Sequence, residues 1–132
     1  MILDPIAASI TAMCGSELKL LPDGVQRVAR WLSQRQHAHA PVMLDGAART
    51  AQQAADALGV QLGQIAKSII FRRVQDNAAV LVITSGDLRV NEAKVAALLG
   101  ELARADAAFV KAATGFSIGG VTPVAHQPLG EQ

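Results

Sequence analysis

The chain has 132 residues, of which 51% are hydrophobic and 17% charged, so it has room for one domain and enough apolar side chains to form a core. Aromatic residues make up only 3% and the formal net charge is +1, which excludes a base-stacking RNA-binding module and a broad basic surface for DNA or RNA. The single cysteine, Cys14, excludes an internal disulfide and a cysteine-rich metal site, as expected of a protein from a reducing compartment. No apolar run approaches the ~20 residues of a transmembrane helix, and the N-terminus lacks the basic start of a secretory signal. We therefore expect a cytoplasmic protein that makes no membrane contact.

The first third of the sequence predicts two helices and a strand. A short helix is expected over residues 5–13. Apolar positions then recur at helical spacing over residues 25–36, and Asp23 is expected to cap this helix. The apolar run at residues 41–44, closed by an Asp-Gly pair, predicts a strand followed by a turn.

The rest of the sequence predicts a hairpin among helices. Thr50 opens a helix that Gly59 ends, and residues 66–74 and 79–84 have the β-branched density of two strands joined by a turn. Two more helices are expected, from Asn91 to Gly100 and over residues 106–113, before a segment rich in glycine and proline. Short strands mixed with helices, in neither a βαβ nor an all-β order, predict a fold of the α/β class (α+β type). We expect a single domain over residues 1–132, with a mixed β-sheet surrounded by helices.

Lys67 is the first candidate functional residue. It lies in residues 65–71 (IAKSIIF), a stretch otherwise suited to burial, where an unpaired ammonium is costly. One interpretation is a strand-end lysine whose ammonium reaches solvent. The other is a positive charge at the mouth of a pocket, suited to a phosphate, a carboxylate or a developing oxyanion.

The second candidate is the glycine segment, residues 114–123 (TGFSIGGVTP). Adjacent glycines at Gly119 and Gly120 allow positive φ angles and a close approach to a ligand, with backbone N–H groups free to donate. The spacing matches neither a dinucleotide fingerprint nor a phosphate-binding Walker loop. A plain tight turn is the alternative interpretation.

The histidines give no metal site. His37 and His39 have a chelating spacing, but no nearby carboxylate or cysteine completes a ligand set, so we expect neither a metal nor another cofactor. His126 follows the glycine segment and is either a surface-loop histidine or part of the same cleft as Lys67.

Taken in order, several segments resemble one known family. Residues 48–60, residues 65–71, residues 85–100 with their Ser-Gly-Asp start, and the glycine segment are together similar to YbaK/EbsC-type aminoacyl-tRNA deacylases, over roughly residues 25–123. This resemblance implies a YbaK-like fold and a pocket for the aminoacylated 3′ end of tRNA. It implies catalytic roles for Lys67, Gly119 and Gly120. It also implies substrate contacts, expected from Thr50, Ser68, Ile118 and His126.

Two departures from the family pattern affect these expectations. Related proteins commonly have glycine where Ala125 stands, and they commonly continue further past the Pro123 region with additional strand and helix. The chain is therefore expected to be short at its C-terminus, and a homodimer could cover a sheet edge left exposed there.

The resemblance implies trans-acting hydrolysis of the ester bond of mischarged aminoacyl-tRNA, with tRNA(Pro) carrying a small wrong amino acid as the expected substrate. Prolyl-tRNA synthetase is a further candidate partner, and DNA is not expected. One alternative is a non-catalytic module of the same fold that binds tRNA or a synthetase. Another is a small-molecule pocket protein unrelated to tRNA.

Overall fold

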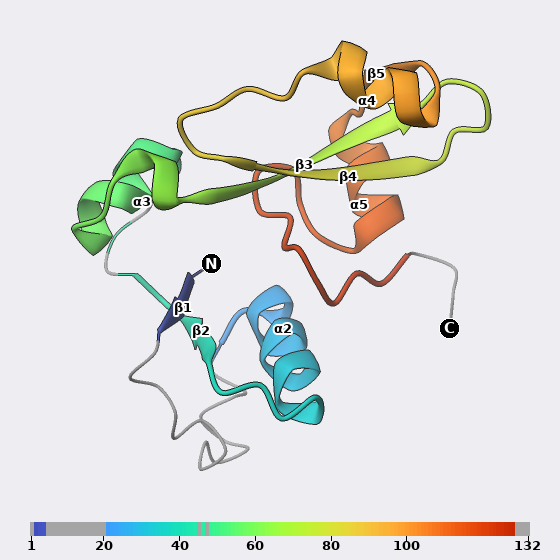
Figure 1. Cartoon of the computed structure of the whole chain (residues 1–132). Coiled ribbons are helices and arrows are strands. Elements are labelled where there is room, and N and C mark those ends of the chain that lie inside the picture. The colour runs from blue at the N-terminus through green and yellow to red at the C-terminus, as the bar shows by residue number, and fades with distance from the viewer. Residues whose placement is uncertain (1, 5–20, 45, 47, 129–132) are drawn as a thin grey trace. The chain divides into compact units, whose positions relative to one another are not determined.

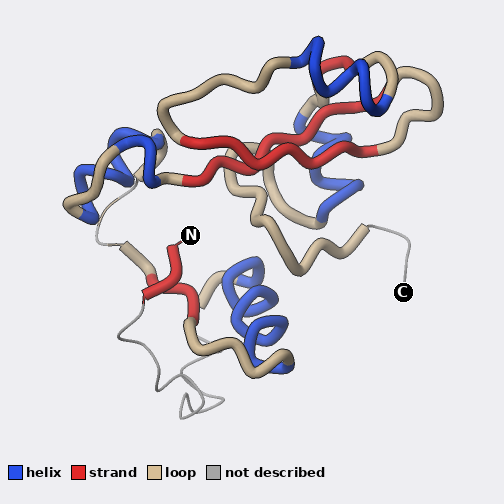
Figure 2. The backbone as a smooth tube through the Cα atoms, viewed as in Figure 1, coloured by secondary structure: helices blue, strands red, loops and turns tan. Residues whose placement is uncertain are grey.

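The computed structural model describes residues 2–4, 21–44, 46 and 48–128 (Figures 1 and 2). The chain divides into two compact units, Met1–Met43 and Leu44–Gln132. The predicted helix at residues 5–13 and Cys14 lie outside the described residues. The single domain over residues 1–132 stays a prediction.

The first unit contains a two-stranded sheet and one helix. Strand β1 (Ile2–Asp4) pairs antiparallel with β2 (Ala40–Val42). Strand β2 corresponds to the strand predicted at residues 41–44, but it begins and ends earlier. Helix α2 (Asp23–Gln34) buries Val28, Ala29 and Leu32, which confirms the predicted periodicity.

The start of α2 differs from the expectation. Pro22 occupies the N-cap position, with φ −54°, and Asp23 is already the first helical residue. Asp23 therefore does not cap the helix, and that prediction was wrong. Its carboxylate lies in the first turn instead, where the helix dipole favours negative charge.

The second unit is organised around an antiparallel sheet of three strands in the order β4-β3-β5. The central strand β3 (Ala66–Arg73) and β4 (Ala79–Ser85) form the predicted hairpin, in a register that pairs Lys67 with Thr84. Strand β5 (Leu102–Arg104), which was not predicted, pairs with the far end of β3 at Phe71–Arg73. Every described strand pairing is antiparallel.

The helices of this unit begin where local side chains accept backbone N–H groups. Helix α3 (Ala51–Leu58) starts with a capping box between Thr50 and Gln53, and it ends at Gly59 with φ 65°. Helix α4 (Glu92–Leu99) is capped by Asn91, and α5 (Ala107–Thr114) by Asp106. These boundaries confirm the predictions. The 3₁₀ turn η2 (Leu62–Gln64) was not predicted.

The core of the second unit lies on both faces of β3. Phe71 and its cross-strand partner Val80 are buried on one face, and Ile70 is buried on the other, because neighbouring strand residues point to opposite faces. Val110 of α5 and Phe116 are also buried. The α+β class with helices around the sheet is therefore confirmed. Among the described helices, none is long and apolar enough to cross a membrane.

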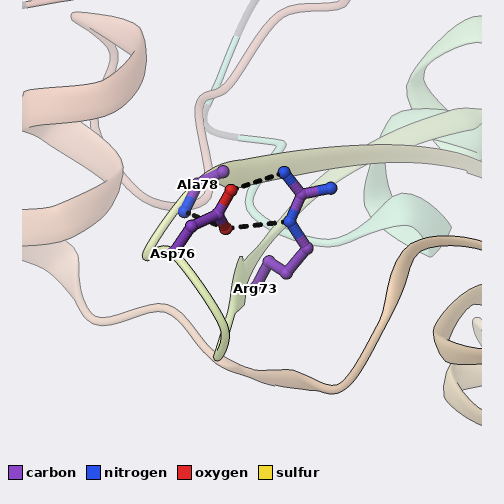
Figure 3. Close-up of polar contacts among 3 residues, drawn as sticks. All are labelled: Arg73, Asp76 and Ala78. Atoms are coloured by element: carbon purple, nitrogen blue, oxygen red, sulfur yellow. Dashed lines mark hydrogen bonds and ion pairs between the residues drawn. The ribbon is translucent and has the colours of Figure 1, made fainter.

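The turn joining β3 to β4 is closed by an ion pair (Figure 3). Arg73 donates from Nε to Asp76 Oδ1 at 2.8 Å and from Nη2 to Asp76 Oδ2 at 2.7 Å. The backbone N–H of Ala78 also donates to Asp76 Oδ1, at 3.2 Å. The hydrogen bonds from Arg73, followed by the one from Ala78, lower the pKa of Asp76 to about 2.

This shift predicts that the turn loses stabilisation in acid. Because the folded pKa lies below the value of 3.8 for an unperturbed aspartate, Asp76 stabilises the fold above about pH 4 and stops doing so as the pH falls through 2. Thermal unfolding followed by circular dichroism should show Asp76→Asn melting below wild type at pH 6. The difference should be small because the pair is exposed, and it should shrink toward pH 2. A difference that stays constant with pH would contradict this assignment.

Candidate active site

Lys67 is the second residue of β3, and its ammonium is bound to the backbone. Lys67 Nζ donates to the carbonyl oxygen of Leu88, 21 residues further along, at 2.8 Å. The residue has intermediate exposure, so the ammonium is neither sealed in the core nor simply extended into solvent. An ammonium has three N–H donors, and the bond to Leu88 occupies one of them. Lys67 is therefore a positive charge held in a defined position, with capacity to bind an anionic or carbonyl oxygen.

The glycine segment forms a tight turn after α5. The N–H of Gly120 donates to Ser117 O at 2.9 Å, and Gly119 has φ 82°, the positive φ that the third position of a type II turn requires. Ile118 lies at the tip of this turn and is 55% exposed. In the described part of the chain, the N–H of Gly119 makes no hydrogen bond. Of the two predicted oxyanion donors, Gly119 is thus the one whose N–H is not used within the turn.

His126 supports the glycine segment from its C-terminal side. Its Nε2 lies 2.6 Å from Thr122 O, and because a carbonyl only accepts, Nε2 carries the proton. The imidazole also meets the buried Phe116 ring edge-on, at a centroid distance of 5.9 Å. Through these contacts His126 stabilises the segment. Its contact with substrate stays a prediction.

Ala125 has an unfavourable backbone conformation. It is buried, with φ 63°, in the left-handed region that favours glycine, and it is the position at which related proteins were expected to have glycine. A left-handed alanine costs roughly 1–2 kcal/mol. The segment after the glycine turn therefore holds Ala125 in a strained conformation.

Replacing Ala125 with glycine should stabilise the protein. The gain should be about 0.5–1 kcal/mol, because relief of strain is partly offset by the greater flexibility of glycine in the unfolded chain. Chemical denaturation of Ala125→Gly and wild type would measure the difference. Ala113→Gly, within helix α5, is the control and should be destabilising by a similar amount. A destabilised Ala125→Gly would show that the methyl group contributes more through packing than it costs in strain.

The remaining predicted site residues belong to different elements of the second unit. Thr50 Oγ1 accepts from Gln53 N at 3.1 Å as the cap of α3. Ser68 follows Lys67 on β3, so the two side chains point to opposite faces of the sheet. Among the described residues, no hydrogen bond, ion pair or ring contact links Lys67 to the glycine segment. Their meeting in one pocket, and the substrate contacts of Thr50, Ser68 and Ile118, stay predictions.

The two neighbouring histidines contact each other. His37 Nδ1 accepts from the backbone N–H of His39 at 3.1 Å, and the two rings are 5.6 Å apart. Within the described residues, no group of three or more His, Cys, Asp or Glu side chains could hold a metal ion. His37 Nδ1 is therefore already used by the backbone.

Removal of metal ions with a chelator tests the expectation that hydrolysis needs no metal. Dialysis against a strong chelator should leave any ester hydrolysis by this protein unchanged, because the expected chemistry uses an ammonium and backbone N–H groups. The rate before and after dialysis is the measurement. Activity that is lost and then restored by zinc would show that His37 and His39 belong to a metal site.

Comparison with known proteins gives matches in sequence and in structure. Residues 45–131 match the sequence family described as aminoacyl-tRNA editing domain. The uncharacterized protein YwhH of Bacillus subtilis (strain 168) is 39% identical over 82 residues, which are 60% of this chain and 52% of the relative. The chain thus spans about half the length of that relative.

Two solved structures share the fold. One is described as a candidate trans-editing enzyme for prolyl tRNA synthetase; it is 38% identical, with a TM-score of 0.74 over 81% of this chain and 68% of that one. The other is the hypothetical protein APE2540, 31% identical, with a TM-score of 0.71 over 77% of this chain and 68% of that one. At these identities the likeness extends from the fold to the sequence.

Proposed function

Because the chain belongs to the aminoacyl-tRNA editing domain family, we propose that it hydrolyses the ester bond of mischarged aminoacyl-tRNA in trans. The proposed substrate is tRNA(Pro) carrying a small wrong amino acid, which the likeness to a candidate trans-editing enzyme for prolyl tRNA synthetase supports. The proposed partners are the aminoacylated 3′ end and, as a second protein, prolyl-tRNA synthetase. The cytoplasm, where tRNA is charged, is the proposed location.

The main structural support for this proposal is the position of the Lys67 ammonium, which a hydrogen bond fixes. Its bond of 2.8 Å to Leu88 O fixes a positive charge at the exposed end of β3. A charge in this position could bind the 3′-terminal phosphate or polarise the ester carbonyl, and the N–H of Gly119 could stabilise the oxyanion that forms on that carbonyl. The attacking group in this scheme is water or the terminal ribose hydroxyl of the substrate.

The direct test is hydrolysis of defined substrates. tRNA(Pro) is charged separately with alanine, serine, cysteine and proline, and loss of each ester is followed with and without the protein. We expect faster loss of at least one small wrong amino acid and no acceleration for prolyl-tRNA(Pro). Equal background loss of all four esters would contradict the proposal.

A non-catalytic binding module is the second candidate function. The Gly120 N–H bonded to Ser117 O and the His126 ring bonded to Thr122 O favour it, because both groups are already satisfied within the protein. Binding of charged or uncharged tRNA(Pro), or of prolyl-tRNA synthetase, without any ester loss would support this alternative.

A further inference from the structure

The acceptor of the Lys67 ammonium belongs to a loop that is tied to the base of the hairpin. After β4 ends at Ser85, Gly86 N donates to Ile65 O at 2.6 Å, which extends the β3–β4 pairing by one step. A Cβ at Gly86 would lie 2.4 Å from Leu62 O, so only glycine allows this approach. The backbone leaving β4 is thus held directly against η2 and the start of β3.

Two side chains then set the shape of this loop. Ser85 Oγ lies 2.7 Å from Gly63 O and 2.6 Å from Asp87 Oδ1, so one hydroxyl proton is shared between two acceptors. The Asp87 carboxylate lies so close to Gly63 that a Cβ there would be 3.0 Å from Asp87 Oδ2. Leu88 N donates back to Ser85 O at 3.1 Å and closes the turn.

The next group along the backbone is the carbonyl of Leu88, which accepts from Lys67 Nζ. Lys67 reaches it on a side chain with four rotatable bonds, so the position of the ammonium depends on a fixed acceptor. The Leu88 side chain itself is 59% exposed and does not pin the carbonyl by burial. The fixed position of Leu88 O therefore depends on the Ser85–Asp87 turn.

We propose that Ser85 and Asp87 are positioning residues for Lys67, acting through the carbonyl of Leu88. This inference rests on the role proposed above for Lys67 in ester hydrolysis. Neither residue has to touch the substrate. Loss of the turn frees the ammonium to sample other positions, and a misplacement of about 1 Å at a reacting group can cost on the order of a hundredfold in rate.

The test compares alanine variants with conservative ones. Ser85→Ala and Asp87→Ala should lower the single-turnover rate about ten- to hundredfold. Asp87→Asn should restore most of that rate, because an amide oxygen still accepts from Ser85 Oγ. Asp76→Ala is the matched control: it removes an aspartate that closes the turn at the opposite end of the same hairpin, and it should leave the rate per folded molecule unchanged.

A second readout does not depend on activity. The labelling rate of the Lys67 amine by a small amine-reactive reagent, followed by peptide mass spectrometry, should rise severalfold in the two alanine variants and not in Asp76→Ala. Unchanged labelling of Lys67 in folded Ser85→Ala and Asp87→Ala would overturn the inference. So would unchanged rates in these variants beside an inactive Lys67→Ala. If wild type hydrolyses no ester, the proposed function fails, and the labelling comparison still decides whether the turn holds Lys67.

Discussion

Lys67→Ala should lose ester hydrolysis by a factor of at least about 10²–10³, the usual effect of removing a group that stabilises the charge of a transition state. The fold should survive, because Lys67 lies at the end of β3, outside the buried core, and the described bond of its side chain is the one to Leu88 O. That bond is worth about 1 kcal/mol, which corresponds to a few degrees in Tm. Single-turnover hydrolysis and thermal unfolding of the same preparations give both quantities.

Two further variants make the Lys67 result specific. Lys94→Ala removes an exposed lysine from α4 and should change neither rate nor Tm, which controls for a general loss of positive charge. Lys67→Arg keeps the charge but replaces a compact ammonium with a planar fork, so it should recover only part of the rate. Near wild-type hydrolysis by Lys67→Ala would remove this residue from the mechanism. A Lys67→Ala chain that does not fold would assign it a structural role.

The glycine segment should respond differently at its two central positions. At Gly119, with φ 82°, a β-carbon is strained even though nothing lies within 4 Å of it. Gly119→Ala should therefore lose about 1 kcal/mol of stability. If its N–H is the oxyanion donor, the rate per folded molecule should also fall about 10²–10³-fold.

At Gly120 a β-carbon would meet only Ser117 O, at the ordinary distance of 3.5 Å. Gly120→Ala should therefore keep its Tm, so any loss of rate in this variant reports crowding of a ligand. This makes Gly120→Ala the cleaner probe of whether substrate approaches the segment. Gly59→Ala supplies the control for strain, because Gly59 also has a positive φ, 65°, with nothing within 4 Å, and it caps α3. Gly59→Ala should lose stability and keep its rate per folded molecule.

The opposite pattern would change the assignment of this segment. Suppose that Gly119→Ala and Gly59→Ala lose similar stability and both keep their rates. Gly119 would then serve only the backbone turn of the glycine segment. Lys67 would then remain as the single catalytic candidate.

Sequence reasoning succeeded where a structure is fixed by neighbouring residues. Thr50, Asn91 and Asp106 marked the starts of three helices because each side chain accepts a backbone N–H within its own first turn. The hairpin was equally readable, because its strands are close in sequence and rich in β-branched residues. Strand β5 was missed because three residues carry no pattern of their own and become a strand only by pairing with β3.

The candidate site shows the same division. Lys67 was conspicuous as a charge in an apolar stretch, and the glycine pair as a turn. The acceptor that holds Lys67 was not predictable, since it is a backbone carbonyl 21 residues away and any residue supplies a carbonyl. The bond between Gly120 and Ser117 was also hidden, because residue types alone do not show which of two adjacent glycines uses its N–H inside the turn.

The unequal pairing of β3 has a consequence for how this strand fluctuates. Among the described residues, Phe71 and Arg72 are paired with both β4 and β5, whereas the stretch from Ala66 to Ile70 is paired with β4 alone. Local opening at the Lys67 end must break the bonds to one neighbour, while opening at the other end must break the bonds to two. Backbone amides near Lys67 should accordingly exchange with solvent faster than those near Arg72. The end of the strand that carries the ammonium can adjust to an incoming ligand while the end that is paired with two strands stays closed.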